Sequence, residues 1–167
     1  LPRLDRWGRQ LAGRLLTGSR ILVAGNGGSA ALAQHLTSEL VGRYREERVP
    51  LSAIALHAES STMTALLNDY GADEVFARQV QAHGRPNDVL LAMSTSGSSP
   101  NVLAAVASAH EIGMATWGMT AGCLSALERV CDETVTVQAG ATSTVQEVHQ
   151  VAIHIMCAAL DREVSAL

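Results

Sequence analysis

The sequence predicts an α/β protein, a three-layer sandwich in which a five-stranded parallel sheet carries helices on both faces. Short apolar runs alternate with helix-like segments along the whole chain. These runs are too short and too uniformly apolar for strands with one wet face, which points to a parallel sheet covered on both sides. With 47% hydrophobic residues, a chain of 167 residues can also bury a sizeable core. We expect one domain over residues 1–167.

The elements can be assigned in chain order. Leu4, Trp7, Leu11 and Leu15 share one helical face, so the chain is expected to open with an amphipathic helix. Apolar runs predict strands at 21–24, 53–56, 89–93, 115–119 and 134–137. Helical segments are expected from about Ser29, after residue 56, from Ser99, near Leu124 and, as a long final helix, from about Ser143. Ligands should bind at the carboxyl ends of the strands.

Composition excludes several classes of partner. The net charge is −4, and the 12 basic residues are all Arg and lie scattered along the chain. Without a basic stripe, and with only 3% aromatic residues, the chain is not expected to bind nucleic acid or an anionic membrane. Cys123, Cys131 and Cys157 have no C-x-x-C spacing, which argues against disulfides and against a cysteine zinc site. No segment has the apolar length of a membrane helix, so we expect a cytoplasmic protein.

A loop rich in hydroxyl groups, STSGSS at 94–99, follows the expected strand at 89–93 and precedes Pro100. Pro is tolerated in a first helical turn, and the N–H groups at a helix start attract an anion. The loop has no lysine, which a nucleotide-type phosphate loop needs, so a single phosphate ester is the expected ligand. A serine-rich turn that only caps the helix is the alternative.

A second loop, GNGGS at 25–29, follows the first expected strand. Its glycines allow main-chain N–H groups and the Asn26 amide to approach a ligand closely. The same residues fit a loose dinucleotide fingerprint. That alternative needs an acidic residue at the end of the second strand, and the segment 53–57, AIALH, has none.

Candidate ligating side chains lie on two expected helices. His35 and Glu39 are four residues apart and project from one helical face. The final helix carries a polar cluster that is costly to bury: Gln146, Glu147, His149, Gln150 and His154. The combination favours a catalytic metal or an acid–base pair over histidines with a structural role. Gln146 and His154 are about 12 Å apart on a straight helix, so we expect a site shared between copies of the chain.

Together these motifs resemble the sedoheptulose 7-phosphate isomerases, the phosphoheptose isomerases of the sugar isomerase (SIS) superfamily. The resemblance spans nearly the whole chain, and it also includes 40–44 (LVGRY) and 68–71 (NDYG). It implies a flavodoxin-like SIS domain and a homo-oligomer, expected to be a tetramer, with sites at subunit interfaces. Zinc would be bound by His35, Glu39, Gln146 and His154. The phosphosugar would be lined by Asn26, Gly27, Gly28, Ser29, Glu39, Arg43, Asn68, Asp69, Ser94, Thr95, Ser96, Ser99 and Gln146. One departure is Ser143, where family members often have Asp.

The resemblance implies conversion of a ketose phosphate to an aldose phosphate through an enediol. Glu39 and His154 are the expected acid–base pair, with Glu39 favoured for the carbon proton, and zinc would polarise the carbonyl. One alternative is a non-catalytic SIS regulator that binds a replication initiator. Retention of His35, Glu39, Gln146 and His154 argues against it. The other is an isomerase of another phosphosugar, because a phosphate loop does not measure the length of the sugar.

Overall fold

Strands and helices alternate in the computed structural model, which describes residues 1–166. The strands are β1 (Ile21–Gly25), β2 (Ala53–Ala55), β3 (Val89–Ser94), β4 (Ala115–Ala121) and β5 (Glu133–Val137). The helices are α1 (Pro2–Leu16), α2 (Gly28–Val41), α3 (Ser60–Tyr70), the 3-10 helix η1 (Ala72–Glu74), α4 (Ala77–His83), α5 (Pro100–Ile112), α6 (Ala126–Val130) and α7 (Thr142–Ala166). The predicted α/β class is confirmed. Within these residues, no helix combines the length and the apolarity needed to cross a bilayer.

The five strands form one parallel sheet in the order β2-β1-β3-β4-β5. Gly25 at the end of β1 is in register with Met93, and Ser94 at the end of β3 is in register with Thr120. The chain moves outward from β1 to one side of the sheet and from β3 to the other. The loops that follow these two neighbouring strands therefore flank the switch point, where open α/β sheets bind ligands.

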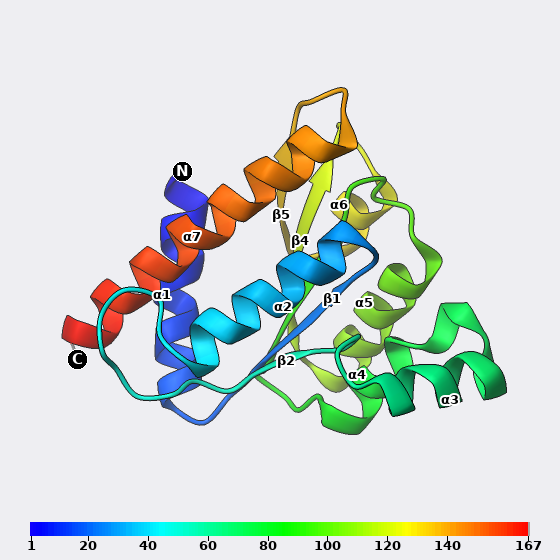
Figure 1. The fold of residues 1–167 in the computed structure, drawn as a ribbon, viewed down its shortest axis with the longest axis horizontal. Helices are drawn as coiled ribbons and strands as arrows, with labels where there is room; N and C mark the ends of the chain where they lie inside the picture. The colour runs from blue at the N-terminus through cyan, green and yellow to red at the C-terminus, as the bar shows by residue number, and fades with distance from the viewer. Residues whose placement is uncertain (167) are drawn as a thin grey trace.

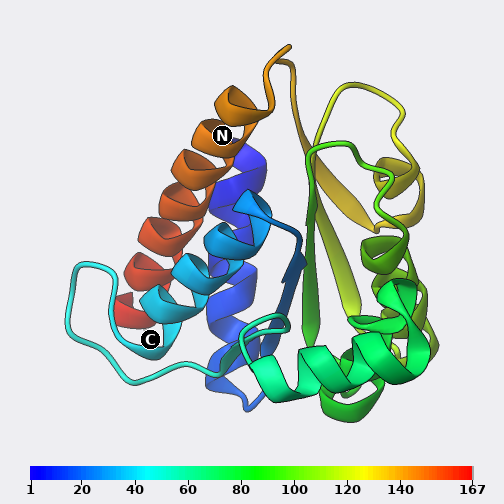
Figure 2. The same ribbon diagram turned by 45° about the vertical axis from the view of Figure 1, so that its right-hand side comes forward.

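Helices cover both faces of the sheet, as the two views show (Figures 1 and 2). Helices α1, α2 and α7 lie on one face, and α3 to α6 lie on the other. Strands β1 and β3 are buried along their whole length, which explains their uninterrupted apolar sequence. Trp7 of α1 stacks on Trp117 of β4, with ring centroids 4.8 Å apart, and so fixes the first helix against the sheet.

Helices α1 and α7 approach each other closely at Gly8. A Cβ atom at this position would lie 2.6 Å from the Cβ of Ala159, well inside van der Waals contact. The other glycine of this helix, Gly13, is exposed and has no neighbour within 4 Å of such an atom. The absent side chain at Gly8 therefore sets how near α7 lies to α1.

Helix α3 is the least buried of the longer helices. None of its residues is fully buried, although Met63 and Leu66 pack partly against the core. Leu67 and Tyr70 remain about half exposed, at 46% and 50%. Its N-terminus is capped by the Glu59 carboxylate, which accepts hydrogen bonds from the main-chain N–H groups of Ser61 and Thr62. A hydrogen bond from the Thr62 side chain, together with these two main-chain bonds, lowers the pKa of Glu59.

The short helix expected near Leu124 is present as α6, and Leu124 itself lies just before it. Leu124 has a positive φ of 61° and is 71% exposed, so it lies in the preceding loop. The helix begins at Ala126, after a capping box in which Ser125 accepts a hydrogen bond from the Glu128 N–H. The Glu128 carboxylate in turn accepts one from the Leu124 N–H. The Ser-x-x-Glu spacing at 125–128 marks the start of this helix.

Candidate functional site

Helices α2 and α7 bring three predicted site residues together. His35 and Glu39 lie one turn apart on α2, and His154 faces them from α7. The Nε2 atoms of His35 and His154 are 2.9 Å apart, and His35 Nε2 lies 3.4 Å from Glu39 Oε1. One ligand atom from each of these three residues lies within 4.8 Å of the ligand atoms of the other two. The cluster can hold one small cation.

The donor set fits zinc. Two imidazole nitrogens and a carboxylate oxygen are ordinary Zn²⁺ ligands, and a fourth position would remain for another ligand. The side chain of His35 is 37% exposed and that of Glu39 is 18% exposed, so the cluster is accessible from outside the chain. Cys157 is not available as a thiolate, because burial, with the charges of Glu39 and Asp161, raises the pKa of its thiol to about 12.

Two glutamines of α7 occupy different places. Gln150 lies beside the cluster, with its Nε2 atom 2.9 Å from His154 Nε2. Gln146 lies one turn nearer the start of α7, where its side chain packs against Gly28: a Cβ atom there would be 2.6 Å from Gln146 Cδ. The structure thus places the predicted ligand Gln146 at the start of α2. Gln150, one turn before His154, was part of the polar cluster in the sequence but absent from the predicted site.

His149 is fully buried on α7 and points away from the cluster, toward the sheet. Its Nε2 atom lies 3.3 Å from the carbonyl oxygen of Thr120, at the end of β4. Burial lowers the pKa of His149, so the imidazole is neutral at pH 7 and donates to that carbonyl. This histidine ties α7 to the sheet and takes no part in the cluster.

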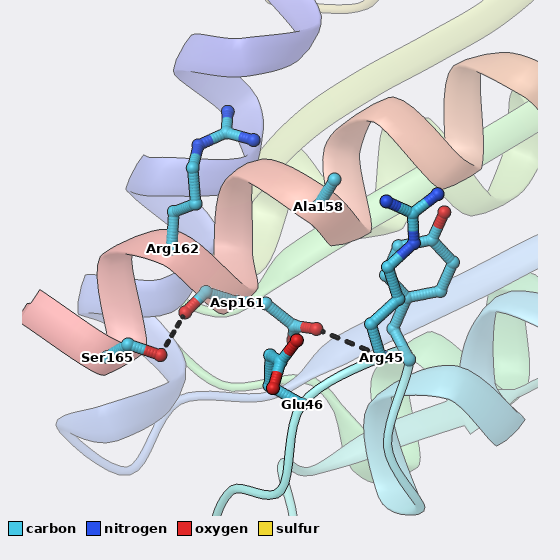
Figure 3. Close-up of a pocket in the computed structure, with 7 residues that line it drawn as sticks. Arg45, Glu46, Ala158, Asp161, Arg162 and Ser165 are labelled. Atoms are coloured by element: carbon cyan, nitrogen blue, oxygen red, sulfur yellow. Dashed lines mark hydrogen bonds between the residues drawn. The ribbon is translucent and has the colours of Figure 1, made fainter.

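The segment after α2 forms one wall beside the cluster. The ring of Tyr44 contacts the ring of His154, with centroids 5.4 Å apart, and the Arg45 guanidinium lies over Tyr44. Arg43 turns back on its own loop, where it contacts the Arg45 carbonyl and the Glu47 carboxylate. A cavity of about 590 Å³ opens next to this wall (Figure 3). It is lined by Tyr44, Arg45, Glu46, Ala158, Asp161, Arg162 and Ser165.

The hydroxyl loop at 94–99 is compact and bonded internally. Ser94, at the end of β3, lies within hydrogen-bond distance of the hydroxyls of Ser96 and Ser99, at 3.2 and 2.9 Å. Its hydroxyl also accepts a hydrogen bond from the N–H of Gly97, whose φ of +63° requires glycine. Ser99 is the N-cap residue of α5, but its side chain makes no cap hydrogen bond. Pro100 has no N–H, and the N–H groups of Val102 and Leu103 bond the Ser99 carbonyl oxygen. Within the described residues, the Asn101 N–H of this turn has no hydrogen-bond partner and can meet an anion.

The glycine loop after β1 is joined to the hydroxyl loop. The side-chain amides of Asn26 and Asn101 donate to each other reciprocally, at 2.9 Å in both directions. Asn101 lies in the first turn of α5, and nothing in the sequence alone marked it as a partner of Asn26. Gly27 has a φ of +52° and lies at the N-cap of α2, where no side chain caps the helix. Ser29 is buried in the first turn of that helix.

The predicted substrate residues Asn68 and Asp69 lie apart from this group. They are exposed at the end of α3, and the Asn68 amide donates to the Asp69 carboxylate at 2.7 Å. Helix α3 lies on the other face of the sheet from α2 and α7 (Figure 2). Within one chain, the structure gathers His35, Glu39 and His154 on one face and the two ligand loops at the strand ends, and it leaves this pair outside both groups.

Comparison with known proteins gives a consistent result. The SIS domain family model matches residues 2–121. A phosphoheptose isomerase of Streptomyces coelicolor is 58% identical over 157 residues, which cover 94% of this chain and 68% of that protein. The solved structure of a phosphoheptose isomerase from Francisella tularensis superposes with a TM-score of 0.91 at 37% identity, over 97% of this chain and 87% of that one.

A second solved structure, the phosphoheptose isomerase GmhA from Neisseria gonorrhoeae, gives a TM-score of 0.88 at 38% identity, over 96% of this chain and 86% of that one. These matches extend over nearly the whole chain. The chain belongs to the SIS domain family and, within it, to the phosphoheptose isomerases.

Proposed function

We propose that this protein isomerises sedoheptulose 7-phosphate to the seven-carbon aldose phosphate, D-glycero-D-manno-heptose 7-phosphate. The observation that carries the proposal is the cluster of His35, Glu39 and His154, which places a carboxylate and two imidazoles together on two packed helices. Membership of the phosphoheptose isomerases supplies the substrate class. The hydroxyl loop and the free start of α5 offer a place for the phosphate group.

The reaction requires two proton transfers at neighbouring carbons. Glu39 removes the proton from C1 of the ketose, the electron pair of that bond forms the C1–C2 double bond, and the C2 carbonyl oxygen takes a proton. In the second half, the C1 hydroxyl loses its proton, C1 becomes the carbonyl carbon, and C2 takes a proton. His154 handles the oxygen protons or returns the proton to C2. The ring contact with Tyr44 holds the His154 imidazole in place.

A zinc ion held by His35, Glu39 and His154 would stabilise the negative charge that develops on the enediolate oxygens. The fourth protein ligand of the proposed set is Gln146. Because Gln146 packs at Gly28, about two turns from His154, it would come from a second copy of the chain. Three valines stand exposed on α2 and α7 for such a contact: Val41, Val148 and Val151. The same second copy would bring other substrate residues, including Asn68 and Asp69, to the site.

The first test is an isomerase assay on the purified protein, with sedoheptulose 7-phosphate compared with fructose 6-phosphate and ribulose 5-phosphate. We expect turnover of the seven-carbon substrate, loss of activity on chelation and recovery with zinc. Glu39→Gln keeps the shape of the side chain but removes the base, so kcat should fall by about 10²–10⁴-fold, as general-base catalysis contributes. Normal turnover by a folded Glu39→Gln variant would exclude the mechanism. Turnover of only the shorter sugar phosphates would contradict the proposed seven-carbon substrate.

The shared site has its own test by mixing two inactive variants. In a mixed oligomer, the Gln146→Ala chain still has an intact cluster and the Glu39→Gln chain still has an intact Gln146. A site that combines the cluster of the first chain with Gln146 of the second is therefore complete. We therefore expect activity to reappear when the two proteins are unfolded and refolded together, and not when each is refolded alone. If no mixture regains activity while native mass spectrometry shows mixed oligomers, each site is built from a single chain.

A further inference from the structure

The side chain of Arg48 joins the end of α2 to α7. Its Nη2 atom donates to the carbonyl oxygen of Glu39 at 2.6 Å, and Nη1 donates to that of Leu40 at 2.9 Å. These are carbonyls of the last helical turn, which have no partner within the helix. Nη1 also donates to the carbonyl oxygen of Val49 at 3.0 Å, and the third nitrogen, Nε, donates to Asp161 Oδ1 at 2.9 Å. The two charged side chains are only 4% and 7% exposed.

Asp161 lies on the same face of α7 as His154. Seven residues separate them, two helical turns, so their side chains project in nearly the same direction. Asp161 also accepts a hydrogen bond from the main-chain N–H of Arg45 at 3.3 Å, and Figure 3 shows its carboxylate directed toward that segment. The loop between α2 and β2 is thereby held on α7 by two bonds to one carboxylate.

The ion pair thus spans the same two helices as the cluster. On α2, Arg48 donates a hydrogen bond to the main-chain carbonyl oxygen of Glu39. On α7, its partner Asp161 lies two turns beyond His154. A metal site tolerates only about 0.2 Å of error in its ligand distances, so a small slide of α2 along α7 would spoil the site. A planar guanidinium that bonds two carbonyls and a carboxylate at once allows little such sliding.

We propose that Arg48 and Asp161 are positioning residues for the cation site. They set the spacing of His35 and Glu39 relative to His154 without contacting the ion or the sugar. This inference rests on the proposed function, because it takes the cluster as the cation site. The pair would then contribute to metal affinity. This role could not be seen in the sequence, because Arg48 and Asp161 are 113 residues apart.

The experiment compares two buried carboxylates. Asp161→Asn keeps the shape and removes the charge that Arg48 needs. The matched control is Asp88→Asn, because Asp88 is also buried, pairs with Arg20 at 3.6 Å, and accepts main-chain N–H bonds. It lies directly before β3, the central strand of the sheet, and contacts neither α2 nor α7 through these bonds. Both variants should have a lower melting temperature than the wild type.

The readouts are the dissociation constant for Co²⁺, from calorimetry on metal-free protein, and the visible absorption bands of the bound ion, which report ligand geometry. We expect Asp161→Asn to bind Co²⁺ about 10–100-fold more weakly and with altered bands, as for lost groups that orient metal ligands. Asp88→Asn should bind it like the wild type. The inference would be overturned if Asp161→Asn bound Co²⁺ with the affinity and absorption bands of the wild type. It would also be overturned if Asp88→Asn weakened Co²⁺ binding as much as Asp161→Asn does.

Arg48→Lys provides a second variant if Asp161→Asn does not fold. It keeps the positive charge but loses the planar fork, and the same loss of Co²⁺ affinity is expected. Wild-type affinity in a folded Arg48→Lys would overturn the inference. Failure of the wild-type protein to bind Co²⁺ or Zn²⁺ is a separate result, because it would refute the cation site of the proposed function itself.

Discussion

The close contact between α1 and α7 makes Gly8→Ala a sensitive probe of the packing that supports the cluster. The new Cβ atom would lie 2.6 Å from the Cβ of Ala159, so the helices must separate by about 1 Å to restore van der Waals contact. Overpacking of this kind costs about 1–3 kcal/mol. Replacing a helical Gly by Ala contributes about 0.5–1 kcal/mol in the opposite direction. The net change in Gly8→Ala is a loss of up to about 2.5 kcal/mol.

Gly13→Ala on the same helix isolates the packing cost. This position has the same gain in helix propensity and no atom within 4 Å of the new Cβ, so the variant should be more stable than the wild type by about 0.5–1 kcal/mol. The difference between the two variants is then about 1–3 kcal/mol, or roughly 2–12 °C in melting temperature for a chain of this length. Urea and thermal unfolding measure it. Equal stability of the two variants would refute the argument from close packing.

Three further predictions concern the site. Gly28→Ala should leave the stability of the fold nearly unchanged, because the flexible end of the Gln146 side chain can move aside. The displaced glutamine should lower kcat/KM about tenfold, which corresponds to about 1.4 kcal/mol. Unchanged kinetics would show that Gln146 is not needed in its present position. Ser99→Ala should destabilise the protein by less than the ~1 kcal/mol of a lost helix cap but weaken binding of inorganic phosphate, and the opposite pattern would favour a capping role. Burial lowers the pKa of His149, so folding stability should be full above pH 6.5 and fall as the pH drops from 6.5 through the lowered value. His149→Gln should flatten this acid limb in unfolding curves, and an identical pH profile would contradict the assignment.

The parts of the fold that were predictable are those governed by local pattern. The strand at 89–93 was recognised because burial on both faces requires an unbroken apolar run, and the structure extends it only by Ser94. The first helix was recognised because Leu4 and Trp7 repeat at helical spacing. The short helix near Leu124 was expected as well, but its first residue was not, because the positive φ that leaves Leu124 outside the helix has no signal in the side chain.

The parts of the site that were not predictable depend on contacts distant in the sequence. The pair of His35 and Glu39 is visible because both lie on one turn, and Gln150 could have been found by the same rule, four residues before His154. Arg48 carries no comparable signal, since its carboxylate partner lies 113 residues away. Asn101 likewise meets Asn26 only because β1 and β3 are neighbours in the sheet. A single domain over 1–167, zinc and the tetramer stay predictions.

The low burial of α3 has a consequence for the order in which the protein opens. None of the residues of α3 is fully buried, and Met63 and Leu66 pack only partly against the core, so local unfolding of this helix should cost less than global unfolding. In an isolated chain, amide protons of 60–70 should exchange with solvent earlier than those of β1 or β3. Asn68 and Asp69 therefore lie on a helix that should open before the central strands of the sheet do.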